Sequence, residues 1–290
     1  MRVHHLNCVS GCPLGGALMD GLSHASLRGR LTSHCLLVES DFGLILVDTG
    51  YGLRDVQSPG DRLHPLFRTL LRPELREEMT ALRQIERLGF KRDDVRHIVL
   101  THLDFDHAGG LDDFPLATVH LLAEERDAAL RQETVLDRMR YRPAQWQHRE
   151  RWHVYPAAAG EPWLDFDSVH PVDGLASEVL LVPLCGHTLG HAGVAVRRVG
   201  DWLLLAGDAY FYRGELDPRR PCCTPGLELY QTLMEKDRRA RLANQKRLRE
   251  LRRRHGGEVT ILCSHDVVEF EAAAGRRHDV PISPSERQPT

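Results

Sequence analysis

Four side chains that bind metal ions well are crowded into one short stretch of the chain. His102, Asp104, Asp106 and His107 lie within six consecutive residues. Imidazole nitrogens and carboxylate oxygens are common ligands of zinc and related divalent ions, which need several such groups at one point. Gly109-Gly110 follows directly and allows close backbone packing beneath such a loop. The stretch therefore predicts a metal site, with a solvated polar loop or a helix N-cap as the alternative.

Three further short motifs carry residues of the same kind. They are Gly186-His187-Thr188-Leu189-Gly190-His191, Gly207-Asp208 and Ser264-His265-Asp266. Each motif has a simple alternative when taken alone: a glycine turn with core histidines, a plain turn, or the start of a helix. Together they are more informative, because each one follows an apolar run that reads as a β-strand.

The apolar runs predict the elements that must position these side chains. The expected strands cover residues 35–39, 44–48, 96–100, 119–122, 179–184, 194–197, 202–206 and 259–263. Four of them stop just before His102, His187, Asp208 or His265. Rigid strands aim the loop residues at their ends toward one place, so these side chains are expected to converge.

Segments between the strands predict helices and irregular structure. Helical spacing of apolar residues is found over 74–89, 123–141 and 227–254. The proline-containing stretch 53–73 is expected to be a long loop or a short helical flap. Residues 142–170 carry Trp146, Trp152, Tyr155 and Trp163 among prolines and are expected to be an aromatic-rich insertion.

Length, composition and charge limit the classes of protein to which the chain can belong. The chain has 290 residues, of which 42% are hydrophobic and 27% charged, with a formal net charge of −3. We expect a single domain over 1–280, with insertions at about 53–90 and 123–170, and a flexible tail at 281–290. Such a charge gives no general attraction for nucleic acid or an anionic membrane. The chain has no apolar run of ~18 residues and no apolar N-terminal signal, so a cytoplasmic location is expected.

These motifs resemble those of the metallo-β-lactamase superfamily, and more closely its lactonase and glyoxalase-II-like branch. The matching segments are Leu46-Val47-Asp48-Thr49-Gly50, Thr101 through Gly110, Gly186 through His191, Ala206-Gly207-Asp208 and Ser264-His265-Asp266. They span nearly the whole chain. The resemblance implies an α+β fold, the four-layer αββα sandwich.

The resemblance also implies a site for two divalent metal ions. His102 and His187 would bind the first ion, and Asp106, His107 and His265 would bind the second. Asp208 would bridge the two ions. Asp48 would orient one of the metal ligands without binding a metal itself. His191 looks structural and is left out of the ligand set.

One residue departs from the family pattern His-x-His-x-Asp-His. Asp104 stands where the second histidine belongs. Aspartate can bind a metal, directly or through a water, but it adds negative charge that should weaken the Lewis acidity of the site. Zinc is the expected metal, with manganese or iron as alternatives because oxygen ligands suit them better than a nitrogen-rich site does.

The activity implied is hydrolysis of a lactone, ester or thioester by a metal-bound hydroxide. Asp106 or Asp208 could move a proton, and Tyr210 or Tyr212 could place a phenol on the substrate carbonyl, although both tyrosines could equally be packing residues. The 53–73 flap and the tryptophans of 142–166 would form an apolar mouth for a small molecule with an acyl or aromatic group. A homodimer is left open.

Three other activities are alternatives. Residues 236–254 contain ten lysines and arginines, which could follow phosphates in a nuclease of the same superfamily, although a solvated helix face is the simpler interpretation. A single iron could support oxygen chemistry on a thiol or persulfide. A weakened site could also bind a ligand without hydrolysing it.

Overall fold

Two six-stranded sheets form the centre of the protein. The structure is a computed structural model that describes residues 1–149, 151–175 and 177–287. The strands of the first sheet, in spatial order, are β1 (Arg2–Asn7), β2 (His34–Ser40), β3 (Gly43–Val47), β4 (Val95–Val99), β5 (Thr118–Leu122) and β6 (Trp152–Tyr155). β1, β2 and β3 pair antiparallel, and β3 through β6 pair parallel.

The second sheet is built from the C-terminal half of the chain. Its strands, in spatial order, are β12 (Val259–Leu262), β11 (Trp202–Leu205), β10 (Ala192–Arg197), β9 (Val179–Pro183), β8 (Phe166–Pro171) and β7 (Glu161–Trp163). Only β11 and β12 pair parallel, and the other neighbours are antiparallel. The eight strands expected from apolar runs are all present, with bounds that differ by at most two residues.

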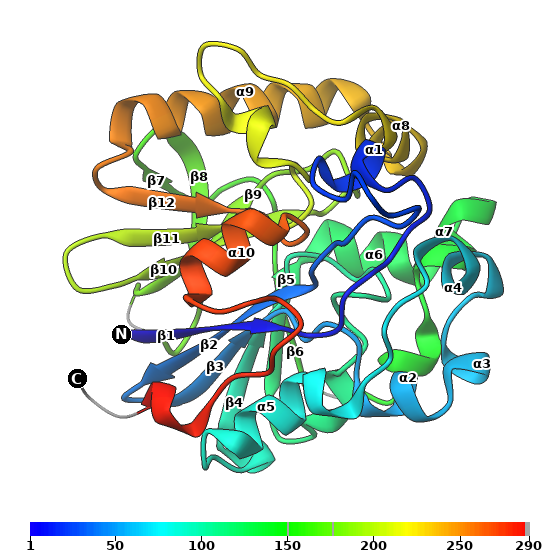
Figure 1. Ribbon diagram of the computed structural model, residues 1–290. Helices are drawn as coiled ribbons and strands as arrows, with labels where there is room; N and C mark the ends of the chain where they lie inside the picture. Colours follow the sequence, from blue (N-terminus) through cyan, green and yellow to red (C-terminus); the bar gives the residue numbers. More distant parts are fainter. Residues whose placement is uncertain (150, 176, 288–290) are drawn as a thin grey trace.

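Helices cover the outer faces of both sheets (Figure 1). Val38, Ile45, Leu181 and Val194 belong to one apolar core between the sheets. On the outside of the first sheet, α5 (Ala81–Arg87) and α6 (Ala123–Arg131) bury their apolar faces in a second core. On the outside of the second sheet, α9 (Arg238–His255) does the same in a third core. This arrangement is the αββα sandwich, and the predicted fold class is confirmed.

Seven further α-helices complete the described part of the fold. They are α1 (Ala17–Asp20), α2 (Leu53–Gln57), α3 (Pro59–Arg62), α4 (Pro65–Leu71), α7 (Val135–Arg140), α8 (Pro225–Met234) and α10 (Val267–Ala274). In Figure 1, α2, α3, α4 and α7 lie together at one side of the sandwich. The 53–73 segment is therefore a set of short helices, which is one of the two expected alternatives.

Three expectations about the elements were wrong. The single helix expected over 123–141 is divided into α6 and α7, because Gln132 takes a left-handed conformation that ends α6 and the Thr134 side chain caps α7. Residues 142–170 are not a simple insertion, because β6 extends the first sheet while β7 and the start of β8 lie at the edge of the second. The single helix expected over 227–254 is broken into α8 and α9. The break occurs because the Asp237 side chain accepts a hydrogen bond from the N–H of Ala240 and caps α9, while the N–H of Lys236 and of Asp237 donate to the carbonyl of Gly186.

The C-terminal segment is more closely packed than expected. Ile282 is buried in the core beneath the first sheet, and its N–H donates to Oε1 of Gln84 at 3.2 Å. Pro284–Arg287 forms a 3₁₀ turn. Packing thus continues past residue 281, the expectation of a flexible tail at 281–290 stays a prediction, and residues 288–290 lie outside the described residues.

Candidate metal centre

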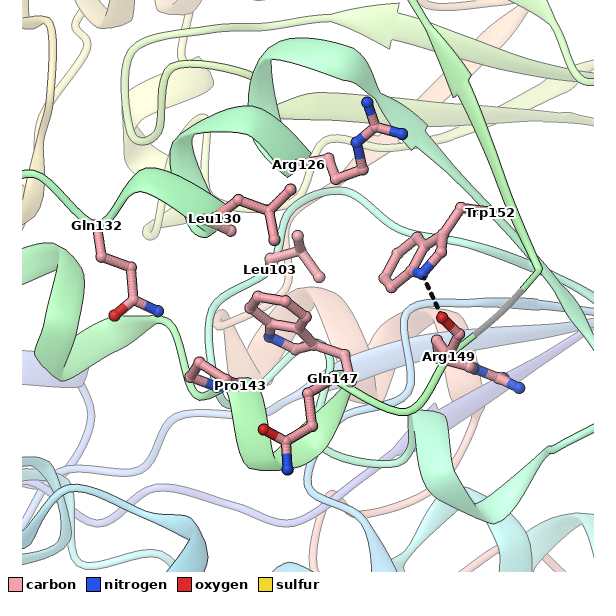
Figure 2. A pocket seen from close by; sticks show the side chains of 10 residues that line it. Leu103, Arg126, Leu130, Gln132, Pro143, Gln147, Arg149 and Trp152 are labelled. Atoms are coloured by element: carbon pink, nitrogen blue, oxygen red, sulfur yellow. Dashed lines mark hydrogen bonds between the residues drawn. The ribbon is translucent and has the colours of Figure 1, made fainter.

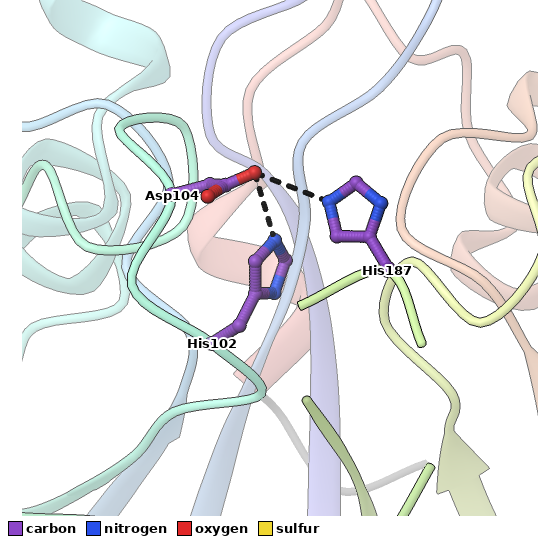
Figure 3. Close-up of side chains that lie close together, drawn as sticks. All are labelled: His102, Asp104 and His187. Carbon is purple, nitrogen blue, oxygen red and sulfur yellow. Dashed lines mark hydrogen bonds and ion pairs between the residues drawn. The ribbon is translucent and has the colours of Figure 1, made fainter. Parts of the chain in front are cut away.

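The loops after β4, β9, β11 and β12 bring the predicted metal ligands to one place. All seven side chains are buried and form three overlapping groups whose ligand atoms lie within 4.8 Å of one another. The groups are His102 with Asp104 and His187, His102 with His107 and Asp208, and Asp106 with His107 and His265. Figure 3 shows the first group, with the Asp104 carboxylate directed at both imidazoles.

The free atoms in this cluster suit metal ions. Nε2 of His102 and Nε2 of His107 are buried, and neither makes a hydrogen bond to any described residue. Nε2 of His107 lies 3.3 Å from Oδ1 of Asp208, and Nε2 of His265 lies 3.0 Å from the same oxygen. Atoms bound to one zinc ion at ~2.0–2.2 Å are separated by similar distances. Because buried nitrogens without partners are costly, the residues fit a metal that would satisfy them.

Contacts behind the ligands fix which nitrogen faces the centre. Nδ1 of His107 lies 2.8 Å from Oδ2 of Asp48, and Nδ1 of His265 lies 2.6 Å from the carbonyl oxygen of Thr32. An imidazole that donates its Nδ1–H to such an acceptor leaves Nε2 unprotonated for a metal. Asp48 thus takes the orienting place expected from the sequence. Its carboxylate also accepts from the N–H and hydroxyl of Thr101 at 2.8 and 2.7 Å.

His191 joins two of the ligand loops. Its Nε2 accepts from the N–H of Asp208 at 2.9 Å, and its Nδ1 lies 3.0 Å from the carbonyl oxygen of Leu184. Burial lowers the pKa of this imidazole to about 3, so it is neutral at physiological pH. Both ring nitrogens are therefore engaged by the backbone, which agrees with the structural role expected for His191.

Glu125 holds two of the ligand loops in place, and the sequence did not predict this role. It lies on α6 and is fully buried. Its carboxylate accepts from the N–H of Leu103 at 2.9 Å and from the N–H of Gly190 at 3.2 Å. One side chain thus fixes the His102–His107 loop and the His187–His191 loop relative to each other. No motif pointed to it, because an acidic residue on an amphipathic helix is usually exposed to solvent.

Arg140 is the second residue that the sequence did not reveal. It comes from α7, is fully buried and forms a two-pronged ion pair with Asp104: Nε to Oδ1 at 2.7 Å and Nη2 to Oδ2 at 2.5 Å. Burial alone would raise the pKa of Asp104, but the Arg140 charge outweighs it and holds that pKa well below its usual range. The extra negative charge expected from Asp104 is therefore offset by a buried cation.

Asp208 is ionised for a related reason. Burial would raise the pKa of its carboxyl group, but the facing imidazoles of His265 and His107 hold that pKa well below the ordinary value. A carboxylate between histidines on several loops is in the position expected for a bridging ligand.

Tyr210 and Tyr212 do not face this cluster in the expected way. Tyr210 is buried in the core under α9, and its hydroxyl donates to Oε2 of Glu269 at 2.8 Å. Tyr212 packs beside Phe211 and has the Arg213 guanidinium 4.5 Å above its ring. The packing interpretation of both tyrosines is the one that the structure favours.

Another pair of tyrosines is better placed. A cavity of about 20 Å³ adjoins the metal ligands and is lined by Tyr51, Asp106, Phe211, Tyr230 and His265, among others. That volume is enough for about one water molecule. Leu71 of the expected flap also lines it.

Two of the three tryptophans expected at the mouth, Trp146 and Trp152, line a different pocket (Figure 2), and Trp163 packs against the core of the second sheet. This pocket has a volume of about 490 Å³, and its walls include Leu103, Leu130, Trp146 and Trp152. Leu103 lies between His102 and Asp104 in the chain, yet its side chain belongs to this pocket rather than to the metal cluster. The expectation that Trp146 and Trp152 form the mouth of the metal site was therefore wrong.

The fold and the buried His/Asp cluster together define a metal-dependent hydrolase. The family model described as the metallo-beta-lactamase superfamily matches residues 28–260. The chain belongs to this superfamily. It is 44% identical over 273 residues to "Probable metallo-hydrolase Rv2300c" of Mycobacterium tuberculosis, an alignment that covers 94% of this chain and 83% of the relative. It is also 32% identical over 129 residues to an N-acyl homoserine lactonase of Bacillus thuringiensis, covering 42% of this chain and 50% of that protein.

Solved structures share the fold at lower sequence identity. An N-acyl homoserine lactone hydrolase with N-hexanoyl-L-homoserine bound at its catalytic metal centre superposes with a TM-score of 0.67 and 22% identity, covering 93% of this chain and 95% of that one. AidC, a dizinc quorum-quenching lactonase, gives a TM-score of 0.58 at 17% identity, covering 91% and 89%. Among the described residues, no helix is both long and apolar enough to cross a membrane.

Proposed function

We propose that this protein hydrolyses a lactone, ester or thioester at a centre of two divalent metal ions, with zinc as the expected metal. The observation that carries the proposal is the buried meeting of His102, His107, His187, Asp208 and His265 from four separate strand ends. The similarity to N-acyl homoserine lactonases supports a cyclic or open ester as the substrate. The cytoplasmic location and a homodimer stay predictions.

The metal supplies the chemistry that no side chain here can supply. A bound divalent ion lowers the pKa of a water and polarises a carbonyl group. Nitrogen-rich groups such as His107 with His265 favour zinc over manganese. Asp48 and the carbonyl of Thr32 keep these imidazoles in the tautomer that the ion requires.

The protein's own residues bind and orient the substrate and move protons. Asp106 and Asp208 line the centre and are the two carboxylates that can accept a proton from the attacking water and pass it to the leaving oxygen. Asp106 also faces the small cavity, as do Tyr230 and Tyr51. We propose that a phenol of this pair, rather than Tyr210 or Tyr212, contacts the substrate carbonyl.

A panel of carbonyl substrates tests this proposal. Zinc-loaded protein is incubated with N-acyl homoserine lactones, aryl esters and acyl thioesters, and acid release is followed. We expect hydrolysis of at least one class, and a loss on the order of 100-fold or more in His107→Ala and His265→Ala. Zinc-loaded, folded protein that hydrolyses none of the three classes would contradict the proposal. Iron-loaded protein that instead consumes dioxygen with a thiol would favour the iron alternative.

A further inference from the structure

Arg140 lies among the ligands of the first metal position. Its Nη2 is 2.5 Å from Oδ2 of Asp104 and 2.6 Å from Nε2 of His187. These two residues are two of the three members of the first ligand group. The guanidinium therefore touches the same atoms that an ion at that position would need.

Arg140 engages lone pairs that a metal ion at this position would need. Arginine has only donors and keeps its proton, so Nε2 of His187 can meet Arg140 only as an acceptor, with its lone pair directed at the guanidinium. The other neighbour of this nitrogen is Oδ2 of Asp104, at the longer distance of 3.1 Å. Nδ1 of His187 makes no hydrogen bond to a described residue. Both oxygens of Asp104 also accept from Arg140. In this group the ring nitrogens without a hydrogen-bond partner among the described residues are therefore Nε2 of His102 and Nδ1 of His187.

The second ligand group lacks such a competitor. Nε2 of His107 has no hydrogen-bond partner among the described residues, and Nδ1 is held by Asp48. The Asp106 carboxylate has His107 and His265 as ion-pair neighbours, each at 4.0 Å. Nε2 of His265 lies 3.2 Å from Oδ2 of Asp208, which is itself a predicted ligand, so no positively charged side chain competes with an ion in the contacts described for this group.

We propose that Arg140 competes with the ion of the first position, so that the two metal positions fill unequally. The chain holds one divalent ion tightly through Asp106, His107 and His265 with Asp208, and a second ion far more weakly through His102, Asp104 and His187. Two physical effects act together: the guanidinium uses the ligand lone pairs, and its positive charge repels a divalent cation a few ångströms away. The inference rests on the proposed metal centre but not on the substrate.

Arg140 is held firmly enough to compete. Its Nη1 donates to the carbonyl of Met234 at 2.8 Å and to that of His187 at 3.3 Å. The side chain is fully buried, and the helix that carries it is joined to the segment between α8 and α9 by the Lys236–Asp137 ion pair at 2.8 Å. Moving the guanidinium away would leave these acceptors and Asp104 without their donor, which is costly in a buried place.

Zinc titration of the metal-free protein tests the inference. Binding is followed by calorimetry, and the ions retained after gel filtration are counted by elemental analysis. Wild type should bind one equivalent tightly and a second on the order of 100-fold more weakly. Two equivalents of equal affinity in wild type would overturn the inference without any variant being needed. A protein that shows unequal sites but hydrolyses nothing would contradict the proposed function and leave this inference standing.

Variants at the same helix identify the cause. Arg140→Met removes the charge and the donors, and it should strengthen the second equivalent by at least ~10-fold. Arg140→Lys keeps a cation and should leave the second equivalent weak. Arg138→Gln is the matched control, because Arg138 is exposed on the same helix and should titrate like wild type. Equal titration curves for wild type and a folded Arg140→Met would overturn the role of Arg140.

A double variant covers the case in which Arg140→Met does not fold. Asp104→His combined with Arg140→Met replaces the ion pair by the histidine of the family motif and an uncharged side chain. No unpaired buried charge is then left at these two positions. It should bind two zinc ions of similar affinity. Asp104→His alone leaves Arg140 without its carboxylate and should not gain the second tight ion. If the folded double variant still bound one ion tightly and one weakly, the competition would be refuted.

Discussion

The carboxylate of Asp48 lies 2.8 Å from Nδ1 of His107 and at the same time binds the N–H of Thr101. One acidic side chain thus joins the end of the first sheet to the ligand loop. Asp48 itself has a positive φ of 55°, a conformation that aspartate and asparagine tolerate better than most residues.

This relationship predicts the effect of Asp48→Asn. Asparagine fits the backbone but carries no charge, so it should hold the Nδ1–H of His107 less well. We expect zinc affinity to fall by roughly 10- to 100-fold, with only a small change in thermal stability. Calorimetric titration and a melting curve measure the two effects. Unchanged zinc affinity in folded Asp48→Asn would show that this contact does not tune the metal site.

Glu125 should contribute to stability rather than to chemistry. Glu125→Ala leaves the buried N–H groups of Leu103 and Gly190 without their acceptor, which should cost about 1–3 kcal/mol for each group. Glu125→Gln keeps one acceptor oxygen and should cost less. Urea unfolding of the three proteins gives the free energies. Equal stability of Glu125→Ala and wild type would contradict this role.

The raised pKa of Glu269 predicts that the free energy of unfolding depends on pH. Burial raises the pKa of this carboxyl from 4.5 to about 7 in the folded protein. The folded state therefore binds the proton more tightly than the unfolded state, so the free energy of unfolding should decrease between about pH 4.5 and 7 and level off above. The change is on the order of 3 kcal/mol.

The matched variant for this test is Glu269→Gln. The glutamine side chain is not ionisable, so the variant should lose this part of the pH dependence while keeping an acceptor for Tyr210. Chemical unfolding at pH 5, 6 and 8 measures it, and other groups that titrate in this range act equally on both proteins. The difference between wild type and variant should change with pH, and a constant difference would contradict the assignment.

Much of the site could be predicted from sequence because its ligands follow apolar strands directly. His102, His187, Asp208 and His265 all stand within a few residues of a strand end, and strand ends are set by local hydrophobic runs. Arg140 and Glu125 could not be predicted in this way. They reach the site from helices whose placement depends on tertiary packing, and a helical pattern alone does not say which charged residue faces inward.

The missed elements have equally local causes. β6 and β7 are short and polar or aromatic, and prolines surround them, so no alternation marks them as strands. The helical pattern across 227–254 is continuous, but one capping aspartate and two backbone contacts to Gly186 interrupt it. Both errors arise where a tertiary contact outweighs a local preference.

The basic end of α9 should not take part in the reaction. Arg252 and Arg253 are exposed, and Arg253 pairs with Glu250 at 2.8 Å on its own helix. The combined change Arg252→Glu and Arg253→Glu should leave hydrolysis of a small neutral ester within about twofold of wild type, because screened surface charges act weakly. A large loss of hydrolysis on such a substrate would contradict the solvated-face interpretation. Nuclease activity in wild type that the double variant loses would contradict it as well.

We expect hydrolysis to depend on metal held by the buried His/Asp cluster. The most direct measurement is lactone hydrolysis by chelator-treated protein before and after zinc is restored, beside His265→Ala treated in the same way. We predict no activity without metal, recovery in wild type on adding zinc, and no recovery in the variant at the same zinc concentration. Full activity in metal-free protein, or equal recovery in His265→Ala, would contradict the account.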